Sequence, residues 1–472
     1  MRSIGAFLAE IDRLPLWRIY VFFAMPFGLF LVYATPPFQT PDAANHFYRA
    51  IQISEGQWRG YRFDGTSGGL IDSNAVKLAT TYEPIKARAN VKANRALAES
   101  VRQLRWTGEL IETGFPNTAI YPAFTYVPQA LAVAVGRALH MTVWSTYRLT
   151  CLVGLLVSML LTAWALRVAR TSSRFIFFLA LLPTTMMISA SVSQEVVMIP
   201  LCFLTIAYFE RFVALQWVLQ GRWRWVFGTA VALCASARPP YGALALLLFY
   251  PGLRVAKGEG YRCWTRIAIA VATGAASFIA MKVFQSPAWL PPGPPRSVSG
   301  QLNFLQHHPA AVFTIALETL RTNAWFYFTS FTGVLGWLDA PLTRSFYLAA
   351  GAACVAALIA TSLDRNSFDE ASNRRRLMLV LPMLICFGLT FAALYLTWTP
   401  VGQWVVEGVQ GRYLTALLPL LALAMPKLNL RWRNDSKGVA LLRRVLTLIV
   451  LALPFYAFQQ AVTTIIDRFY VQ

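Results

Sequence analysis

The sequence predicts an all-α polytopic membrane protein. Hydrophobic residues make up 57% of its 472 residues and charged residues only 13%, a balance that a water-soluble domain does not have. Apolar runs of about 17 to 22 residues recur along the chain, long enough to cross a bilayer as helices. The basic residues, which give a net charge of +21, cluster between these runs, as the positive-inside rule predicts. The charge therefore indicates topology, and we expect no nucleic acid partner.

The first span is expected at about 17–35. Three arginines accompany its start, Arg2, Arg13 and Arg18, which places the amino terminus inside. No small-x-small cleavage site follows before Pro36, so we interpret the segment as a retained anchor rather than a signal peptide. The residues that follow it, beginning with Asp42, should then lie on the outer face.

Residues 36–143 form the first outer loop, which is too long and polar to be a simple connector. We expect a basic helix from Glu83 to Arg105, which could hold an anionic acceptor or be solvated. The apolar segment 119–139 contains two prolines and Gln129. Counting it as a span would place the arginines after the next span outside, so we interpret it as a membrane-surface or re-entrant element.

The remaining spans alternate between the two faces and complete a single transmembrane domain over 1–472. We expect a second outer loop at 286–344, with the carboxyl terminus outside and no internal repeat. Eleven spans are predicted in all, the later ten at about 144–166, 175–192, 196–212, 225–237, 241–253, 267–285, 345–362, 377–397, 412–426 and 445–462.

A carboxylate, an imidazole and a guanidinium follow the first span: Asp42, His46 and Arg49. Thr40 and Pro41 resemble a helix start, and in that helix the three residues share one face. Ionisable groups at a membrane face are expensive and usually functional, so we expect Asp42 to act as a general base. The alternative is that Asp42 complements the helix dipole while the other two contact water or headgroups.

A second carboxylate, Glu195, follows Gln194 and a serine-rich turn between two spans. It could lie near Asp42 and bind an acceptor hydroxyl or a divalent cation, or be exposed at a loop tip. Two carboxylates alone are not a metal signature. The six cysteines have no CxxC and no metal-type spacing, so we interpret them as small core residues. No cofactor is predicted with certainty, and a divalent cation stays an open alternative.

Arg238 and Arg412 each interrupt an apolar stretch on the predicted outer side. Either could bind a lipid phosphate bidentately, or extend to the headgroups. The turn that contains Trp337 and Asp339 resembles an interfacial turn, for which a simple membrane anchor is the alternative. The chain has no P-loop, Rossmann fingerprint, GxSxG or HExxH motif, so it offers no visible pocket for a soluble nucleotide.

Six short motifs follow one another along the chain. They are Pro-Pro-Phe-Gln-Thr-Pro-Asp42-Ala-Ala-Asn-His46, Tyr121-Pro-Ala-Phe-Thr-Tyr, Leu182-Pro-Thr-Thr, Arg238-Pro-Pro-Tyr241, Gly336-Trp337-Leu-Asp339 and Gln410-Gly-Arg412-Tyr413. Taken in order, these motifs resemble a family of bacterial polytopic membrane proteins known as domain of unknown function 2142. That family is in turn similar to the C-type (GT-C) membrane glycosyltransferase superfamily. The resemblance covers nearly the whole chain.

The resemblance implies a GT-C-like bundle and an inverting glycosyltransferase of the bacterial inner membrane, with its active site facing outwards. The donor would be a polyprenyl-phosphate-linked sugar, and the acceptor an envelope glycan or lipid-linked molecule. The catalytic base maps onto Asp42. This chain has Ala43 where the family commonly has Glu, and Glu195 where it tends to have Asp. The expected substrate-binding residues are His46, Arg49, Tyr121, Gln194, Glu195, Arg238, Tyr241, Trp337, Asp339, Gln410, Arg412 and Tyr413.

Two other functions fit a polytopic protein with buried charges. A transporter or flippase of a lipid-linked or anionic envelope substrate also places ionisable residues within its spans. Such proteins usually have two related halves, which this sequence lacks. The other hypothesis is a non-catalytic assembly protein of the envelope, which predicts that substitutions at Asp42 have little effect.

Overall fold

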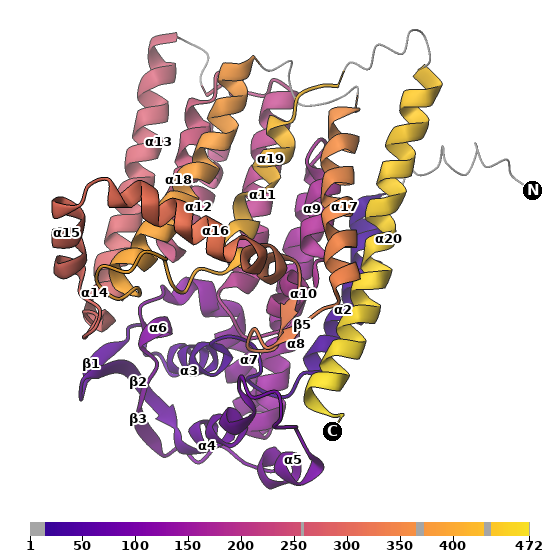
Figure 1. The fold of residues 1–472 in the computed structure, drawn as a ribbon. Coiled ribbons are helices and arrows are strands. Elements are labelled where there is room, and N and C mark those ends of the chain that lie inside the picture. Colours follow the sequence, from indigo (N-terminus) through magenta and orange to yellow (C-terminus); the bar gives the residue numbers. More distant parts are fainter. Residues whose placement is uncertain (1–14, 256–258, 365–371, 429–435, 472) are drawn as a thin grey trace, which may run out of the picture.

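Long apolar helices lie side by side and form the upper part of the molecule in Figure 1. The computed structural model describes residues 15–255, 259–364, 372–428 and 436–471; Arg2 and Arg13 lie outside them. Within these ranges seven helices are long and apolar enough to cross a membrane, which agrees with the predicted all-α polytopic class. They are α2 (Leu16–Ala34), α8 (Val143–Val168), α11 (Glu195–Ala214), α13 (Glu259–Ala280), α17 (Arg344–Ser362), α18 (Asn373–Thr397) and α20 (Ser436–Phe469).

The other four predicted spans are helical but short or broken. Three of the interruptions coincide with Pro183, Pro239 and Pro419, where the ring removes a backbone donor and restricts the preceding residue. Helices of this length do not cross a bilayer alone. Of the eleven predicted spans, seven are therefore full-length helices within the described residues. All seven residues of α10 are buried, as irregular backbone at membrane depth requires. These elements are α9 (Ser173–Ala180), α10 (Pro183–Ser189), α12 (Arg222–Ala237), η3 (Pro239–Phe249), η5 (Gly411–Leu417) and α19 (Pro419–Ala424).

The first outer loop is a folded layer below the long helices (Figure 1). It contains an antiparallel sheet in the order β1-β2-β3, which the sequence analysis did not anticipate. The dipeptide Asp64-Gly65 could have predicted the hairpin from the sequence, because Asp-Gly is typical of two-residue β-turns. In the structure both residues have positive φ and join β1 to β2. The elements are α3 (Ala43–Ser54), β1 (Tyr61–Phe63), β2 (Thr66–Asp72), α4 (Ser73–Tyr82), η1 (Glu83–Ile85), α5 (Arg95–Arg102), β3 (Leu110–Gly114), α6 (Pro116–Ala119), η2 (Ala123–Tyr126) and α7 (Val127–Ala138).

The expected helix from Glu83 to Arg105 is wrong. Only η1 and α5 are helical there, and α5 begins at a cap in which Asn94 accepts the amide of Leu97 at 2.7 Å. Arg468 of α20 donates hydrogen bonds to this segment, from Nη2 to the carbonyl of Ile85 at 2.7 Å and from Nη1 to the carbonyl of Val91 at 3.1 Å. The Ile85 carbonyl also accepts the amide of Arg88 at 3.3 Å.

The segment 119–139 does not form a spanning helix. Its helical part, α7, has 12 residues, well short of the roughly 20 needed to cross a bilayer. The buried Gln129 donates from Nε2 to the carbonyl of Ser193 at 3.0 Å. This bond joins α7 to the turn before α11.

The second outer loop also folds against the helices. It contains α15 (Val298–His307), α16 (Ala311–Thr332) and a hairpin of β4 (Val334–Leu335) and β5 (Ala340–Pro341). Figure 1 shows α16 lying across the long helices rather than along them. The first loop meets this region through Arg62, which donates to the carbonyl of Ser286 at 2.9 Å.

Candidate functional site

Four segments far apart in the sequence meet where the outer layer joins the long helices. A small cavity of about 20 Å³ is bounded by residues of the loop after α2, of α10 and the turn that follows it, of the β4–β5 hairpin and of the start of η5. The sequence predicted that these segments share one face of the membrane, and the structure places them in contact. Representative lining residues are Thr40, Ser193, Gly336 and Arg412.

Asp42 occupies a left-handed backbone conformation immediately before α3. Its φ is 62°, a region uncommon for residues other than glycine but tolerated by aspartate. The helix begins at Ala43, so Thr40 is not its cap and Pro41 is not its first residue. The Asp42 carbonyl accepts the amide of His46 at 2.9 Å, whereas its carboxylate makes no capping hydrogen bond. The side chain is therefore free to serve another purpose.

A chain of two amide side chains orients the Asp42 carboxylate. Asn117 donates from Nδ2 to Asp42 Oδ1 at 2.7 Å, and Asn45 donates to Asn117 Oδ1 at 2.6 Å. Within the described ranges no other side chain hydrogen-bonds this carboxylate. Burial raises the pKa of Asp42, and the positive charges of Arg412 and Lys86 oppose that rise. The geometry therefore yields a fixed, partly desolvated carboxylate of increased basicity.

Asp42 lines a cavity of about 160 Å³, and Trp337 forms part of its wall. The Lys86 ammonium lies 3.8 Å from the centre of the Trp337 ring, and the Trp337 indole donates to the carbonyl of Phe38 at 2.9 Å. Trp337 is thus fixed inside the protein rather than serving only as a membrane anchor. The sequence analysis did not assign Lys86 to the site. The lining residues are Phe38, Gln39, Asp42, Ala44, Asn45, Tyr82, Glu83, Lys86 and Trp337.

Glu195 is buried between two arginines. Arg238 Nη2 lies 2.6 Å from Glu195 Oε1, and Arg412 Nε lies 3.7 Å from Oε2. The Glu195 side chain is 5% exposed and that of Arg412 9%, so Glu195 is not at an exposed loop tip and Arg412 does not extend to the headgroups. Arg238 and Arg412 carry two positive charges and Glu195 one negative charge, so these three residues, the arginine cluster, have a net positive charge. Because both Glu195 oxygens face guanidinium groups, they are poorly placed to coordinate a divalent cation.

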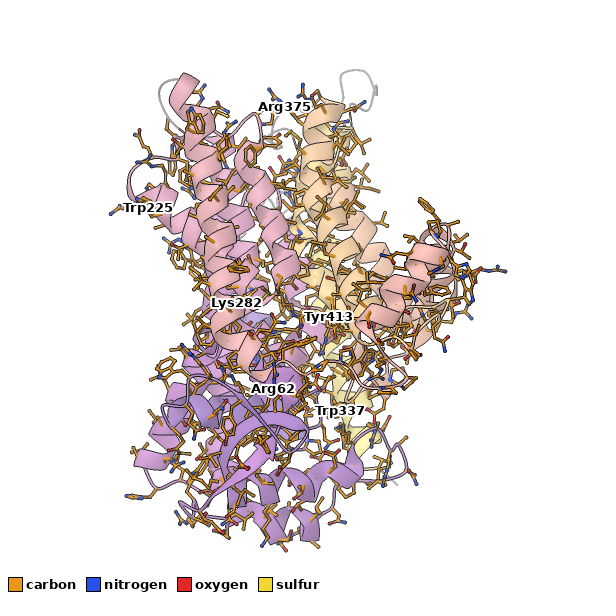
Figure 2. All side chains as sticks on the ribbon, turned by 90° about the vertical axis from the view of Figure 1, so that its left-hand side faces the viewer. Arg62, Trp225, Lys282, Trp337, Arg375 and Tyr413 are labelled. Atoms are coloured by element: carbon orange, nitrogen blue, oxygen red, sulfur yellow. The ribbon has the colours of Figure 1, made fainter. Side chains whose placement is uncertain are left out.

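Tyr413 lies beside both arginines. Its ring centre is 4.7 Å from the guanidinium carbon of Arg238 and 5.6 Å from that of Arg412. Tyr241 is buried, and its amide donates to the carbonyl of Arg238 at 2.9 Å. Figure 2 shows Tyr413 at mid-height, between Trp337 below and Arg375 above. The arginine pair therefore lies deeper among the helices than Trp337.

Several buried polar atoms beside this cluster have no hydrogen-bond partner in the described ranges. They are both amide ends of Gln194, Oε1 of Gln410 and Nε of Arg412. Buried polar atoms are nearly always satisfied in folded proteins, so each exception invites an explanation such as a binding or catalytic role. Three such residues around one carboxylate indicate a place where a polar ligand can gain hydrogen bonds.

His46 and Arg49 face inward but have partners of their own. His46 Nδ1 lies 2.6 Å from the Tyr126 hydroxyl, and the imidazole stacks parallel to Tyr121. Burial lowers the pKa of His46 to about 3, so the ring is neutral near pH 7. Arg49 is fully buried and donates to Gln52 and to the carbonyls of Trp58 and Tyr121. Of the three residues predicted on one face, only Asp42 lines the 160 Å³ cavity.

Asp339 also has a structural partner. Arg468 Nη2 lies 2.6 Å from its Oδ2, and Oδ1 accepts the amide of Trp337 at 2.8 Å. The carboxylate therefore fixes the turn that carries Trp337 and attaches it to α20. Arg468 was not among the residues that the sequence analysis predicted at the site. Within the described ranges, no group of three or more His, Cys, Asp or Glu residues is arranged to hold a metal ion.

The family model described as "Predicted membrane protein (DUF2142)" matches residues 25–421. The matched region includes both outer loops and every candidate site residue named above. No curated protein and no solved structure matches the chain.

Proposed function

Since the chain belongs to the DUF2142 family of predicted membrane proteins, we propose a function that uses this membrane-associated site. The protein is proposed to be an inverting glycosyltransferase of GT-C type in the bacterial inner membrane. It would transfer a sugar from a polyprenyl-phosphate-linked donor to an envelope glycan or lipid-linked acceptor on the outer face.

The proposed reaction is a single displacement at the anomeric carbon. The acceptor oxygen forms the new bond as Asp42 takes its proton, and the polyprenyl phosphate departs with the electron pair of the old bond. The 160 Å³ cavity beside Asp42 would admit the acceptor. Trp337 offers an aromatic face against which the apolar face of a sugar ring can pack.

The departing phosphate needs cationic stabilisation. Arg412 fits this role because its buried Nε has no hydrogen bond within the described ranges, and guanidinium groups bind phosphate oxygens bidentately. Glu195 and Arg238 would hold Arg412 in place. The charge of Arg412 acts on the Asp42 carboxylate, so the proposed base and the proposed phosphate ligand lie within electrostatic reach of each other.

The observation that carries the proposal is the Asp42 carboxylate itself. It makes no capping bond, is fixed by Asn117 and lines a cavity. The test is transfer by the purified protein, reconstituted in lipid nanodiscs, from a panel of polyprenyl-phosphate sugars, with release of polyprenyl phosphate as the readout. Asp42→Asn should abolish transfer without loss of folded protein.

Asp64→Asn is the matched control. Asp64 also has positive φ, but it lies in the exposed turn between β1 and β2, so its substitution should leave transfer unchanged. Undiminished transfer by the Asp42 variant would remove the catalytic assignment.

One observation favours the alternative of a transporter or flippase. The helices on either side of the arginine cluster are broken at buried positions, as in α9–α10 and η5–α19, and discontinuous helices are typical of transporter binding sites. Movement of a fluorescent lipid-linked sugar across proteoliposomes, without any transfer product, would support that function instead.

A further inference from the structure

A second basic pocket lies at the opposite end of the long helices from Asp42. Figure 2 shows Arg375 near the top of the molecule and Trp337 far below it. The pocket has a volume of about 230 Å³, far above the roughly 10–15 Å³ that one water needs. None of the described residues that line it is acidic. They are Gln216, Pro251, Gly252, Leu253, Arg254, Arg266 and Arg375.

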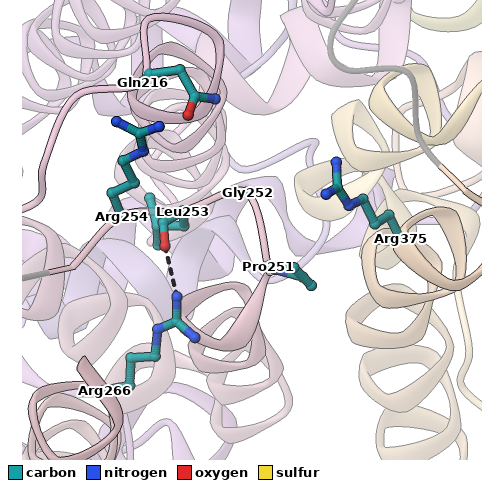
Figure 3. Close-up of a pocket in the computed structure, with 7 residues that line it drawn as sticks. All are labelled: Gln216, Pro251, Gly252, Leu253, Arg254, Arg266 and Arg375. Carbon is teal, nitrogen blue, oxygen red and sulfur yellow. Dashed lines mark hydrogen bonds between the residues drawn. The ribbon is translucent and has the colours of Figure 1, made fainter. Parts of the chain in front are cut away.

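Three guanidinium groups reach this pocket from three different segments. Arg254 follows η3, Arg266 is on α13 and Arg375 is on α18. Figure 3 shows Arg254 and Arg266 on one side of the turn at Pro251, with Arg375 across from them. Three guanidinium groups that line one hollow provide planar sets of N–H donors for the oxygens of an anion bound there.

The backbone of the pocket is held in place by hydrogen bonds. Arg266 Nη2 donates to the carbonyl of Leu253 at 2.7 Å, the dashed line in Figure 3. The amide of Leu219 donates to the carbonyl of Arg254 at 2.6 Å. The turn is thus tied both to α13 and to the segment after α11, so the pocket is a built feature of the fold rather than a chance grouping of surface side chains.

Two exposed tryptophans lie near the start of α12 and of α13. Trp264, two residues before Arg266, is 74% exposed, and Trp225 is 69% exposed. They border an apolar groove of about 320 Å³ between α12 and α13. Exposed tryptophans concentrate at the headgroup level of a bilayer, so we expect Arg266, two residues after Trp264, to lie close to lipid phosphates.

We propose that this pocket binds the phosphate of an anionic membrane lipid, such as phosphatidylglycerol. Planar guanidinium forks match phosphate oxygens, and basic pockets between membrane helices are suited to such headgroups. The site is separate from the proposed transfer chemistry and does not depend on it. The arginines would then act as a specific lipid-binding site in addition to setting topology.

The test measures lipid binding to the purified full-length protein by native mass spectrometry in neutral detergent. Phosphatidylglycerol should bind and phosphatidylcholine should not. Arg254→Gln and Arg375→Gln should each weaken phosphatidylglycerol binding about five-fold. Arg374→Gln is the control, because Arg374 is exposed, adjacent on α18 and outside the pocket.

Two outcomes would overturn the proposal. Equal weakening by Arg374→Gln would mean that only the overall charge of this face matters. Displacement of the lipid by millimolar inorganic phosphate would assign the pocket to a soluble phosphate compound instead. The melting temperature of each variant without added lipid identifies any that fails to fold, and Arg254→Gln, at an exposed position, should keep the parent value.

Discussion

Arg238 and Glu195 are joined by a 2.6 Å ion pair that connects the end of α12 to the start of α11. Glu195 is also the counter-charge of Arg412. One carboxylate therefore positions two arginines that the sequence separates widely. The stability of this region and the proposed phosphate ligand both depend on Glu195.

Glu195→Gln should destabilise the protein. It removes the carboxylate that the buried Arg412 and the partly buried Arg238 share, and breaking a buried pair in this way costs about 3–5 kcal/mol. Thermal unfolding in detergent measures the loss. Glu83→Gln, an exposed substitution in the outer layer, should leave the melting temperature unchanged, and equal melting temperatures for the two variants would contradict the structural role of Glu195.

Arg412→Gln should weaken use of the donor while leaving some transfer. A hydrogen bond to a charged group contributes about 1.5–3 kcal/mol, which corresponds to a rise of roughly 10- to 150-fold in the donor KM. Steady-state kinetics with varied polyprenyl-phosphate sugar provide the measurement. Arg321→Gln, at a side chain 80% exposed on α16, is the control, and an unchanged donor KM for the Arg412 variant would exclude it as the phosphate ligand.

Asn117→Ala should shift the acid limb of the pH–activity profile to higher pH. A base must be deprotonated, so activity falls as pH drops through the pKa of Asp42, which burial already raises above 3.8. The bond from Asn117 lowers that pKa, and its removal therefore raises it further. Lys86→Gln should move the limb in the same direction because the Lys86 charge also lowers the pKa. A limb that stays in place in both variants would argue against Asp42 as the titrating base.

Gly411→Ala should be strongly destabilising, because a Cβ at this position would overlap the carbonyl oxygen of Tyr327 on α16. The amide of Gly411 also donates to Ser330 Oγ at 2.9 Å, so this close approach sets the position of the next residue, Arg412. Gly274→Ala on α13 meets open space and should be neutral. Folded yield and melting temperature distinguish the two, and a wild-type melting temperature for Gly411→Ala would contradict the packing.

Arg468→Gln should loosen the segment between η1 and α5. Arg468 donates to the carbonyls of Ile85 and Val91 and pairs with Asp339. Limited trypsinolysis should then cleave faster after the exposed Arg88. Resistance equal to that of the parent protein would show that other contacts hold the segment.

The sequence predicted which groups share a face but not how they pair. Charge distribution placed Glu195, Arg238 and Arg412 on one side of the membrane, and the structure brings them into contact. The roles of Arg49 and Asp339 could not be predicted, because the backbone carbonyls and the distant arginine that bind them are set by tertiary packing. Lys86 was predicted within a helix, and Arg468, which binds two backbone carbonyls of that segment, is far from it in the sequence.

The attachment of Arg468 to the outer layer has a consequence for biosynthesis. The layer that bears Lys86 is made well before α20, and chains fold progressively as they are synthesised. The segment that carries Lys86 therefore reaches its native position only after α20 has been inserted. A chain truncated before α20 would contain Asp42, Glu195 and both cluster arginines and still lack an ordered wall of the cavity beside Asp42.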